Sequence, residues 1–249
     1  MNSYHDLKEL TMRLRFLLGA ALLIGTMAAA DEIRVVAAAD LNHVFRDIAA
    51  RFEKETGYKV NLIIGSSGNF YSQIQNGAPF DLFFSADIQY PQKLAAAGLA
   101  EKGSLSPYAV GKIVLWVPNA SKLDIKQGMA ALQDPSRRKI AIANPAHAPY
   151  GRAAVAALKS EKLFDEVSSK FVLGENVSQA AQFVQSGNAD ADILSLVVVP
   201  AMKDAGRYFG IPASECPVIE QTAIVLASSK NKNSARLFMD FLKNPRSRN

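Results

Sequence analysis

The chain has 249 residues, 49% of them hydrophobic and 20% charged, which excludes an intrinsically disordered protein because disorder requires low hydrophobicity and high net charge. One cysteine, Cys216, and three widely spaced histidines exclude an intrachain disulfide and a cysteine-based metal site, and argue against a multi-histidine one. The formal net charge of +5 comes from scattered basic residues without interleaved aromatic residues, so the pattern does not indicate nucleic-acid binding.

The first thirty residues have the pattern of a signal peptide. Basic residues precede a short apolar run at residues 16–27, and Ala28-Ala29-Ala30 then places small residues where signal peptidase reads the chain. The run is shorter than the ~20 apolar residues that span a bilayer. We therefore expect residues 1–30 to be a signal peptide that is removed before Asp31; an uncleaved membrane anchor is the alternative.

Short apolar runs then alternate with segments of helical periodicity. The runs predict strands at residues 33–37, 59–64, 81–86, 113–117, 139–143, 171–173, 191–196 and 218–227. The periodic segments predict helices between Asp40 and Gly57, near residues 70–75, and at residues 89–97, 151–163, 177–185 and 233–243. This alternation predicts an α/β fold with parallel sheet flanked by helices. The spacing leaves open whether the chain forms one large domain or two lobes, with residues 112–117 and 218–227 as possible crossings between lobes.

Three loops occur where open α/β sheets bind ligands, at strand ends that lead into helices. They are Ala38-Ala39-Asp40, Gly65-Ser66-Ser67-Gly68 and Asn176-Val177-Ser178, and a fourth loop, Pro149-Tyr150-Gly151, also opens a helix. Helix N-termini carry unpaired amides and a partial positive charge, so several that converge form an anion site without a cation. Taken alone, each of these loops is more often a helix cap than a binding site.

A serine hydrolase is an alternative, with His147 as the base for Ser66 or Ser67. The serines do not lie in a Gly-x-Ser-x-Gly motif, and the spacing places no acidic partner beside the histidine. The pattern therefore favours a binding protein without catalytic residues.

Several longer motifs occur in a fixed order between residues 33 and 243. They are Gly65-Ser66-Ser67-Gly68, Gln73-Ile74, Asn76-Gly77-Ala78-Pro79, Asp81-Leu82-Phe83-Phe84-Ser85-Ala86-Asp87, Gly111-Lys112-Ile113-Val114-Leu115-Trp116, Asn144-Pro145, Ala148-Pro149-Tyr150-Gly151 and Glu175-Asn176-Val177-Ser178-Gln179. In this order and spacing they resemble the molybdate-binding periplasmic proteins of ABC transporters.

The resemblance implies a type II periplasmic binding protein fold, in which two hinged lobes of mixed, mainly parallel sheets flanked by helices hold the oxyanion in a cleft. It assigns residues 31–111 and 225–249 to one lobe and residues 112–224 to the other. Carried over by position, the ligand contacts come from Ala39 and Asp40, from the hydroxyl and amide of Ser67, and from the backbone amides of Tyr150 and Val177.

The resemblance also implies a monomeric periplasmic protein without enzymatic activity. Its ligand would be molybdate or tungstate, and its partners would be the membrane permease and ATPase subunits of an ABC transporter. No cofactor or metal ion is implied, because molybdenum is bound only as its oxyanion. Phosphate or another tetrahedral oxyanion is the alternative ligand.

Three features depart from the family pattern. At Ala39-Asp40 the family usually has a hydroxyl or amide side chain, and a carboxylate there would repel a dianion. Asp40 is therefore expected either to cap its own helix and turn away, or to accept a proton from a protonated oxyanion such as phosphate. Asp192 stands where the family often has glycine, on a strand expected to be buried, and residues 245–249 stop short of the usual closing segment.

Overall fold

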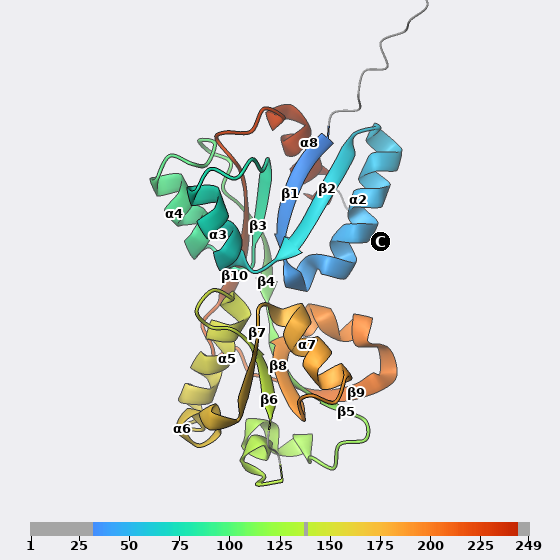
Figure 1. Cartoon of the computed structure of the whole chain (residues 1–249), viewed down its shortest axis with the longest axis vertical. Coiled ribbons are helices and arrows are strands. Elements are labelled where there is room, and N and C mark those ends of the chain that lie inside the picture. The colour runs from blue at the N-terminus through green and yellow to red at the C-terminus, as the bar shows by residue number, and fades with distance from the viewer. Residues whose placement is uncertain (1–31, 137–138, 244–249) are drawn as a thin grey trace, which may run out of the picture. The chain divides into compact units, whose positions relative to one another are not determined.

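The computed structural model describes residues 32–136 and 139–243, which form two five-stranded sheets with flanking helices (Figure 1). Both sheets belong to one unit that begins at Glu32. The predicted signal peptide and residues 244–249 lie outside the described residues. Within the described part, no helix has the length and apolar character needed to span a bilayer. The prediction of an α/β fold is confirmed, and the strands form two separate sheets.

The first sheet has the strand order β2-β1-β3-β10-β4. Its strands are β1 (Glu32–Ala38), β2 (Lys59–Gly65), β3 (Leu82–Ser85), β4 (Ser106–Gly111) and β10 (Ile219–Val225). β1 pairs in parallel with β2 and β3, whereas β10 pairs antiparallel with β3 and β4. The sheet is therefore mixed, and a strand from late in the chain lies between two strands from the first half.

Helices cover both faces of the first sheet because successive side chains of a strand point to opposite faces. These helices are α2 (Asn42–Thr56), α3 (Ser67–Gln75), α4 (Gln89–Ala96) and α8 (Lys232–Lys243). Val35 and Ala37 of β1 pack with α2 and α8, whereas Val36 between them packs with α3 and α4. Phe45 and Phe52 of α2 are buried in this packing.

The second sheet has the strand order β7-β6-β8-β5-β9. Its strands are β5 (Ile113–Pro118), β6 (Ile140–Ala143), β7 (Phe171–Gly174), β8 (Ala191–Ser195) and β9 (Gly206–Gly210). β6 pairs in parallel with β7 and β8, and β5 pairs antiparallel with β8 and β9. The helical segments of this lobe are η3 (Ile125–Gln133), α5 (Pro149–Ser160), α6 (Phe164–Val167), η4 (Ser168–Lys170), α7 (Val177–Gln185) and η5 (Leu196–Ala205).

The chain passes between the two sheets twice. The first crossing is at Lys112, between β4 and β5, at the expected boundary. The second lies between Gly210, where β9 ends, and Ile219, where β10 begins. The return to the first lobe thus precedes the expected boundary at residue 225, because β10 pairs with β3 and β4 of the first sheet. The apolar run at residues 218–227 is a strand of one lobe and not a crossing segment.

Two edge strands, β4 and β9, have no counterpart among the predicted elements. β4 is half exposed, contains Pro107 and carries the exposed Val110, so it lacks the apolar run of a buried strand. Proline and exposed side chains are typical of sheet edges, where one side of the strand forms no ladder. Helix α5 begins at Pro149, two residues before the predicted start, because proline suits the first turn of a helix.

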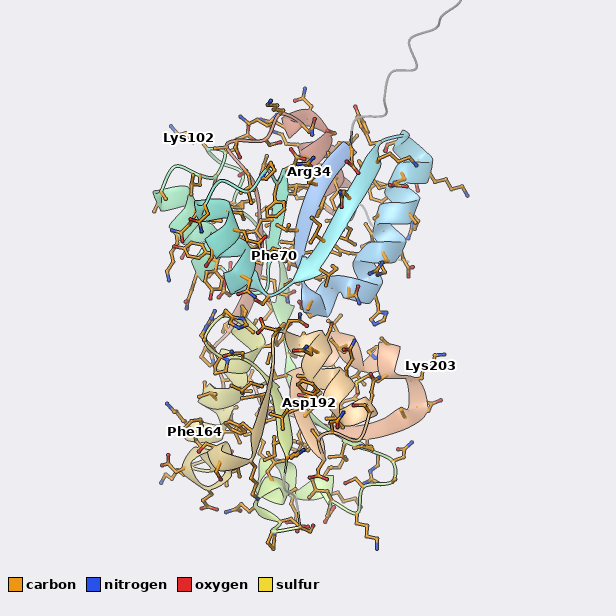
Figure 2. The ribbon with its side chains drawn as sticks, viewed as in Figure 1. Arg34, Phe70, Lys102, Phe164, Asp192 and Lys203 are labelled. Carbon is orange, nitrogen blue, oxygen red and sulfur yellow. The ribbon has the colours of Figure 1, made fainter. Side chains whose placement is uncertain are left out.

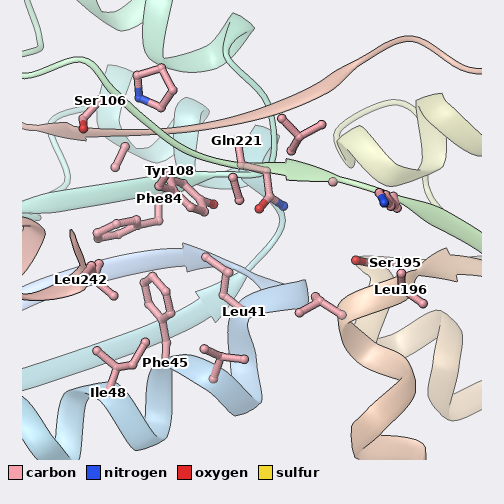
Figure 3. A pocket seen from close by; sticks show the side chains of 18 of the residues that line it. Leu41, Phe45, Ile48, Phe84, Ser106, Tyr108, Ser195, Leu196, Gln221 and Leu242 are labelled. Carbon is pink, nitrogen blue, oxygen red and sulfur yellow. The ribbon is translucent and has the colours of Figure 1, made fainter. Parts of the chain in front are cut away.

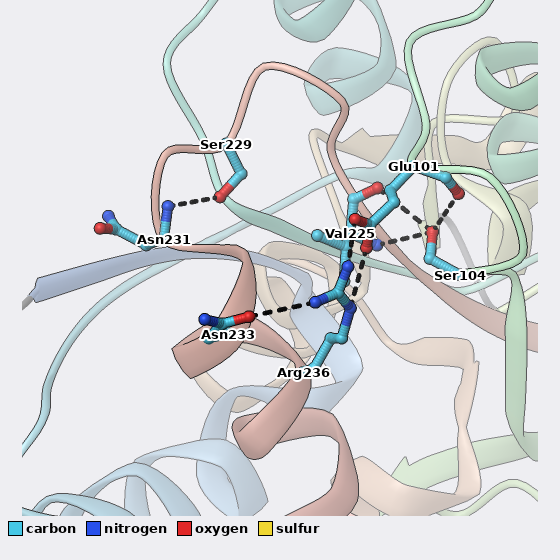
Figure 4. Close-up of polar contacts among 7 residues, drawn as sticks. All are labelled: Glu101, Ser104, Val225, Ser229, Asn231, Asn233 and Arg236. Carbon is cyan, nitrogen blue, oxygen red and sulfur yellow. Dashed lines mark hydrogen bonds and ion pairs between the residues drawn. The ribbon is translucent and has the colours of Figure 1, made fainter.

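Polar contacts fasten α8 to the loops at one end of the first sheet (Figure 4). Arg236 Nε donates to Glu101 Oε2 at 3.1 Å, and its Nη1 donates to Asn233 Oδ1 at 3.2 Å. Ser104 Oγ donates to the carbonyl oxygens of Glu101 at 2.8 Å and Val225 at 3.3 Å. The bond to Glu101 ties α8 to the segment after α4, and the bond from Ser104 ties that segment to the end of β10.

Asp192 of β8 lies inside the second lobe, as Figure 2 shows, and is fully buried. In the described part of the chain, neither of its carboxyl oxygens has a hydrogen-bond partner, and the same is true of the indole nitrogen of Trp116, directly opposite on β5. Burial raises the pKa of Asp192 well above its usual value. The expectation that this strand is buried is confirmed, and the fold favours the uncharged form of the acid.

We expect Asp192→Asn to change how stability depends on pH. The pKa of Asp192 is higher in the folded than in the unfolded state, so the protonated acid favours the folded protein. This contribution to the free energy of unfolding is fully present at acidic pH and is lost as the pH rises through the folded-state pKa. Asparagine cannot ionise, so the variant should exceed the original protein by about 1–3 kcal/mol in free energy of unfolding at mildly alkaline pH, with little difference in acid.

Urea unfolding across a pH series measures this difference. The exposed Asp165→Asn of α6 serves as the control, and it should follow the original protein. If the free energy of unfolding depends on pH in the same way for Asp192→Asn and for the original protein, the pKa of Asp192 is the same in the folded and unfolded states, contrary to the prediction.

Candidate anion-binding site

In the first lobe, two neighbouring strands end beside one another and lead directly into helices. β1 and β2 are parallel, with Ala38 in register with Gly65, so the segments that follow start at the same edge of the sheet. After β1 the chain enters a 3₁₀ turn, η2 (Ala39–Leu41), which continues into α2. After β2 it enters α3, whose N-cap Ser66 accepts a hydrogen bond from the Asn69 amide at 3.4 Å.

The second lobe repeats this arrangement. β6 and β7 are parallel, with Ala143 in register with Gly174, and they lead into α5 and α7. Pro149 occupies the first turn of α5. Asn176 caps α7, and its Oδ1 accepts from the amides at positions 178 and 179 at 3.0 and 3.1 Å. Each lobe therefore presents two helix starts at one edge of its sheet.

The four helix starts meet around one small cavity. Its empty space, including the part open to solvent, is about 210 Å³. All five residues expected to contact a ligand line it, namely Ala39, Asp40, Ser67, Tyr150 and Val177. The structure thus brings together the residues that the sequence placed at one site, although they come from four separated loops.

The wall of this cavity is rich in hydrogen-bond donors and contains no cation. Ser67, Tyr150 and Val177 lie in the first turns of α3, α5 and α7, where amides have no acceptor inside the helix. Ser67 Oγ accepts from the Ala86 amide at 3.0 Å, so its own hydrogen remains to be donated. Such amides, together with the positive ends of the helix dipoles, favour a small anion. In the described residues, no cluster of His, Cys, Asp or Glu could hold a metal ion.

Asp40 is the one acid in the wall, and its exposed fraction is only 2%. Its Oδ2 accepts from the Tyr150 hydroxyl at 3.0 Å and from Gln221 Nε2 at 2.5 Å. Asp40 is not at a cap position, because the cap positions of η2 and α2 are Ala38 and Leu41. The expectation that Asp40 caps its own helix is therefore wrong. Burial raises the pKa of Asp40, and the hydrogen bonds from Gln221 and Tyr150 offset part of that rise. The backbone amides of Asp40 and Leu41 also lower the pKa of this carboxyl group.

The two lobes contact each other around His147. The Gly68 amide of the first lobe donates to the His147 carbonyl oxygen at 2.9 Å, and Ser66 Oγ lies 3.0 Å from His147 Nδ1. Glu175 accepts from Asn69 Nδ2 at 3.2 Å across the same boundary. On the other side of the cavity, the Ser178 hydroxyl donates to the Ala39 carbonyl oxygen at 2.9 Å. Hydrogen bonds therefore join the lobes on two sides of the cavity.

Ser66, His147 and Glu175 form a serine–histidine–acid set that the spacing did not reveal, since His147 Nε2 lies 3.6 Å from Glu175 Oε2. A catalytic serine has to reach its substrate. Ser66 is only 4% exposed, and its hydroxyl oxygen already caps α3. The Glu175 side chain is 62% exposed, so solvent weakens its hold on the histidine. This geometry fits a contact between lobes better than a nucleophile.

A larger cavity lies beside the crossing at Lys112 (Figure 3). Its empty space, counted in the same way, is about 1560 Å³. Apolar side chains of α2, β3, η5 and α8 dominate its wall, among them Phe45, Phe84 and Leu196. Tyr150 lines both cavities. An apolar wall cannot replace the water around an anion, so the small cavity is the candidate site.

Gln221 is a residue beside the site that the sequence did not predict. Its Nε2 donates to Asp40 Oδ2 and to the Tyr150 hydroxyl, the latter at 2.9 Å. Gln221 lies in β10, which was predicted as a strand, and it is 3% exposed. An uncharged polar residue within a strand expected to be buried was the available signal, because such a side chain needs a partner.

Comparisons with known proteins agree with this geometry. Residues 33–249 match the family model described as bacterial extracellular solute-binding protein. The chain is 41% identical over 236 residues to the molybdate-binding protein ModA of Azotobacter vinelandii, which covers 94% of this chain and 92% of that protein. It is 36% identical over 218 residues to the molybdate-binding protein ModA of Rhodobacter capsulatus, covering 88% of this chain and 85% of that one.

The fold is also similar to a solved structure, the periplasmic molybdate-binding protein of Azotobacter vinelandii. The TM-score is 0.81 at 36% sequence identity, and the match covers 86% of this chain and 94% of that chain.

The two lobes are in close contact at Gly68, and a substitution there tests whether this contact is needed for binding. A Cβ atom at this position would lie 2.6 Å from the His147 carbonyl oxygen and 2.6 Å from the Tyr90 hydroxyl. We expect Gly68→Ala to push the second lobe away from α3 and to weaken the affinity for molybdate, the oxyanion named for the relatives, by at least about tenfold, or ~1.4 kcal/mol.

Calorimetric titration measures the affinity, and circular dichroism checks that the variant is folded. Gly210→Ala is the matched control, because a Cβ atom at Gly210 meets no atom within 4 Å. Equal affinities for the Gly68 and Gly210 variants would show that the contact at Gly68 is not needed for binding.

Proposed function

Because the chain belongs to the bacterial extracellular solute-binding proteins, we propose that it captures molybdate, or the closely similar tungstate, for uptake by an ABC transporter. The chain has the two-lobed type II periplasmic binding protein fold. The 41% identity with a relative named for molybdate, across 94% of this chain, supports the choice of ligand. The relatives are binding proteins of transport systems, so binding and release are the whole reaction and no bond is broken.

The observation that carries the proposal is the cavity where four helix starts meet. A tetrahedral dianion presents four oxygens in different directions, and the cavity offers amides from α3, α5 and α7 together with η2. We propose that Ala39, Asp40, Ser67, Tyr150 and Val177 make the ligand contacts, Ser67 through both hydroxyl and amide and the last two through their amides. Neutral donors hold the anion through dipoles and hydrogen bonds alone.

This donor set links binding to closure of the lobes. Ala39, Asp40 and Ser67 belong to the first lobe, whereas Tyr150 and Val177 belong to the second. An anion held by one lobe has only part of its hydrogen bonds, so it stabilises the arrangement in which both lobes surround it. Opening of the lobes removes the donors of one lobe at once, and a site without a cation then releases the anion readily.

We propose that the closed, liganded protein acts as a monomer outside the cytoplasmic membrane and docks on the permease of an ABC transporter whose ATPase subunits power uptake. Family membership supports the location and the class of partner. Residues 1–30 supply the export signal in this proposal.

The proposal predicts a specific order of anion affinities. Molybdate and tungstate have the same charge and nearly the same size, whereas sulfate is smaller. In a cavity whose donors are spaced for molybdate, sulfate would leave some of these donors unpaired. Phosphate carries a proton near neutral pH and brings an extra donor into a wall of donors. We expect calorimetry to show tight binding of molybdate and tungstate, and binding at least about a hundredfold weaker, or ~2.7 kcal/mol, for sulfate and phosphate. Phosphate binding equal to or tighter than molybdate binding would overturn this assignment.

The Ser67 hydroxyl provides a second prediction. Ser67→Ala removes a donor to a charged ligand, and such hydrogen bonds contribute about 1.5–3 kcal/mol, so we expect molybdate affinity to fall by about ten- to a hundredfold. Ser72→Ala, an exposed serine of the same helix, is the control and should bind like the original protein. An unchanged affinity in Ser67→Ala would remove this hydroxyl from the site.

A further inference from the structure

The two oxygens of the Asp40 carboxyl group have different surroundings. Oδ2 accepts two hydrogen bonds, from the Tyr150 hydroxyl at 3.0 Å and from Gln221 Nε2 at 2.5 Å. Oδ1 is buried and has no partner among the described residues, although Asp40 lines the anion cavity. A carboxylic acid keeps one oxygen as an acceptor and carries its proton on the other. In a protonated Asp40, Oδ2 would remain the acceptor because two donors already point at it. Oδ1 would then carry the proton.

The groups that face Asp40 do not neutralise its charge. Tyr150 of α5 and Tyr108 of β4 are the titratable neighbours, and burial raises the pKa of each well above its usual value, so both stay uncharged. Gln221 of β10 does not titrate, and Ser178 of α7 contacts only the backbone of this turn, at Ala39. None of the ion pairs within the described residues includes Asp40.

A negative carboxylate in this position would meet a dianion with no cation between them. In surroundings of low polarity, like charges a few ångströms apart repel strongly, and a proton on the carboxyl group removes that repulsion. The proton would also turn a repelling group into a donor aimed at an oxygen of the ligand. The site then gains a donating side chain at Asp40.

We propose that Asp40 binds the oxyanion as a neutral acid, with Oδ1–H donating to a ligand oxygen, so that the protein takes up one proton with each dianion. The proposal rests on the proposed function and assigns one residue of that site. The proton comes from solvent, it resides on Oδ1 in the complex, and it returns to solvent when the anion leaves. The role is the opposite of accepting a proton from a protonated ligand such as phosphate.

Proton uptake makes affinity depend on pH. Where Asp40 is ionised in the free protein and neutral in the complex, linkage requires affinity to fall as the pH rises, by up to about tenfold per pH unit. Burial raises the pKa of Asp40, which places this dependence closer to neutral pH than for an exposed aspartate. Molybdate is fully deprotonated at neutral and alkaline pH, so the ligand contributes no proton change of its own there.

The test compares the original protein with Asp40→Asn, whose amide donates a hydrogen bond but cannot ionise. Calorimetric titrations with molybdate are run from about pH 6 to pH 9, each in two buffers of different ionisation enthalpy, which gives the number of protons taken up. For the original protein we expect close to one proton per molybdate near pH 8 and an affinity that falls by about tenfold per pH unit. For Asp40→Asn we expect no proton uptake from this site and a nearly constant affinity, which makes it the tighter binder at high pH.

Each other outcome has a definite meaning. Molybdate binding without proton uptake, at an affinity that does not change with pH in either protein, overturns the role of Asp40 and leaves the proposed function standing. Phosphate binding that is tight in the original protein and lost in Asp40→Asn shows that the carboxylate accepts a proton from the ligand, which also overturns it. If the folded original protein binds neither molybdate nor tungstate at any pH, the proposed function is wrong, and so is this inference. The proton count on the original protein does not depend on the variant, so the test holds even if Asp40→Asn is poorly folded.

Discussion

An amide in the first turn of a helix has no acceptor inside that helix, and in this protein four such turns surround one cavity. The parallel strand pairs place them there. β1 and β2 end in register in the first lobe, and β6 and β7 end in register in the second, so each lobe presents two helix starts along one edge of its sheet. Much of the remaining structure serves to hold these edges opposite each other. The two crossings and the contacts around His147 join the lobes and hold one edge against the other.

Asp40 and Asp192 are both buried, but only Asp40 lines the candidate site, and the hydrogen-bond partners of the two carboxyl groups differ. Asp192 lies within the core of the second lobe with both carboxyl oxygens unpaired in the described structure, and it is a cost to stability whenever it ionises. Asp40 has two side-chain donors on one oxygen and none on the other, at the wall of the candidate anion cavity. The difference lies in the neighbours, because burial acts on both groups in the same direction.

The parts of the site that are local in sequence could be predicted, and the parts that depend on distant pairing could not. A strand followed by Gly65-Ser66-Ser67-Gly68 predicts a helix start, because the strand end, the cap and the first turn lie within a few residues. Gln221 is 181 positions from Asp40, and nothing in the local pattern of either residue indicates their hydrogen bond. Glu175 beside His147 was missed for the same reason. β4 and β9 were missed because edge strands need no continuous apolar run to pair on one side.

The position of β10 has a consequence for the order in which the lobes can form. All strands of the second sheet lie between residues 113 and 210, so that sheet can be completed from one continuous stretch of chain. The first sheet needs β10 between β3 and β4, and β10 ends only at Val225, near the finish of synthesis. In a nascent chain that has not reached Ile219, β1, β2 and β3 cannot be joined to β4, because β10 is missing between β3 and β4. The lobe that leaves the ribosome first is thus the last to complete its sheet and close its core.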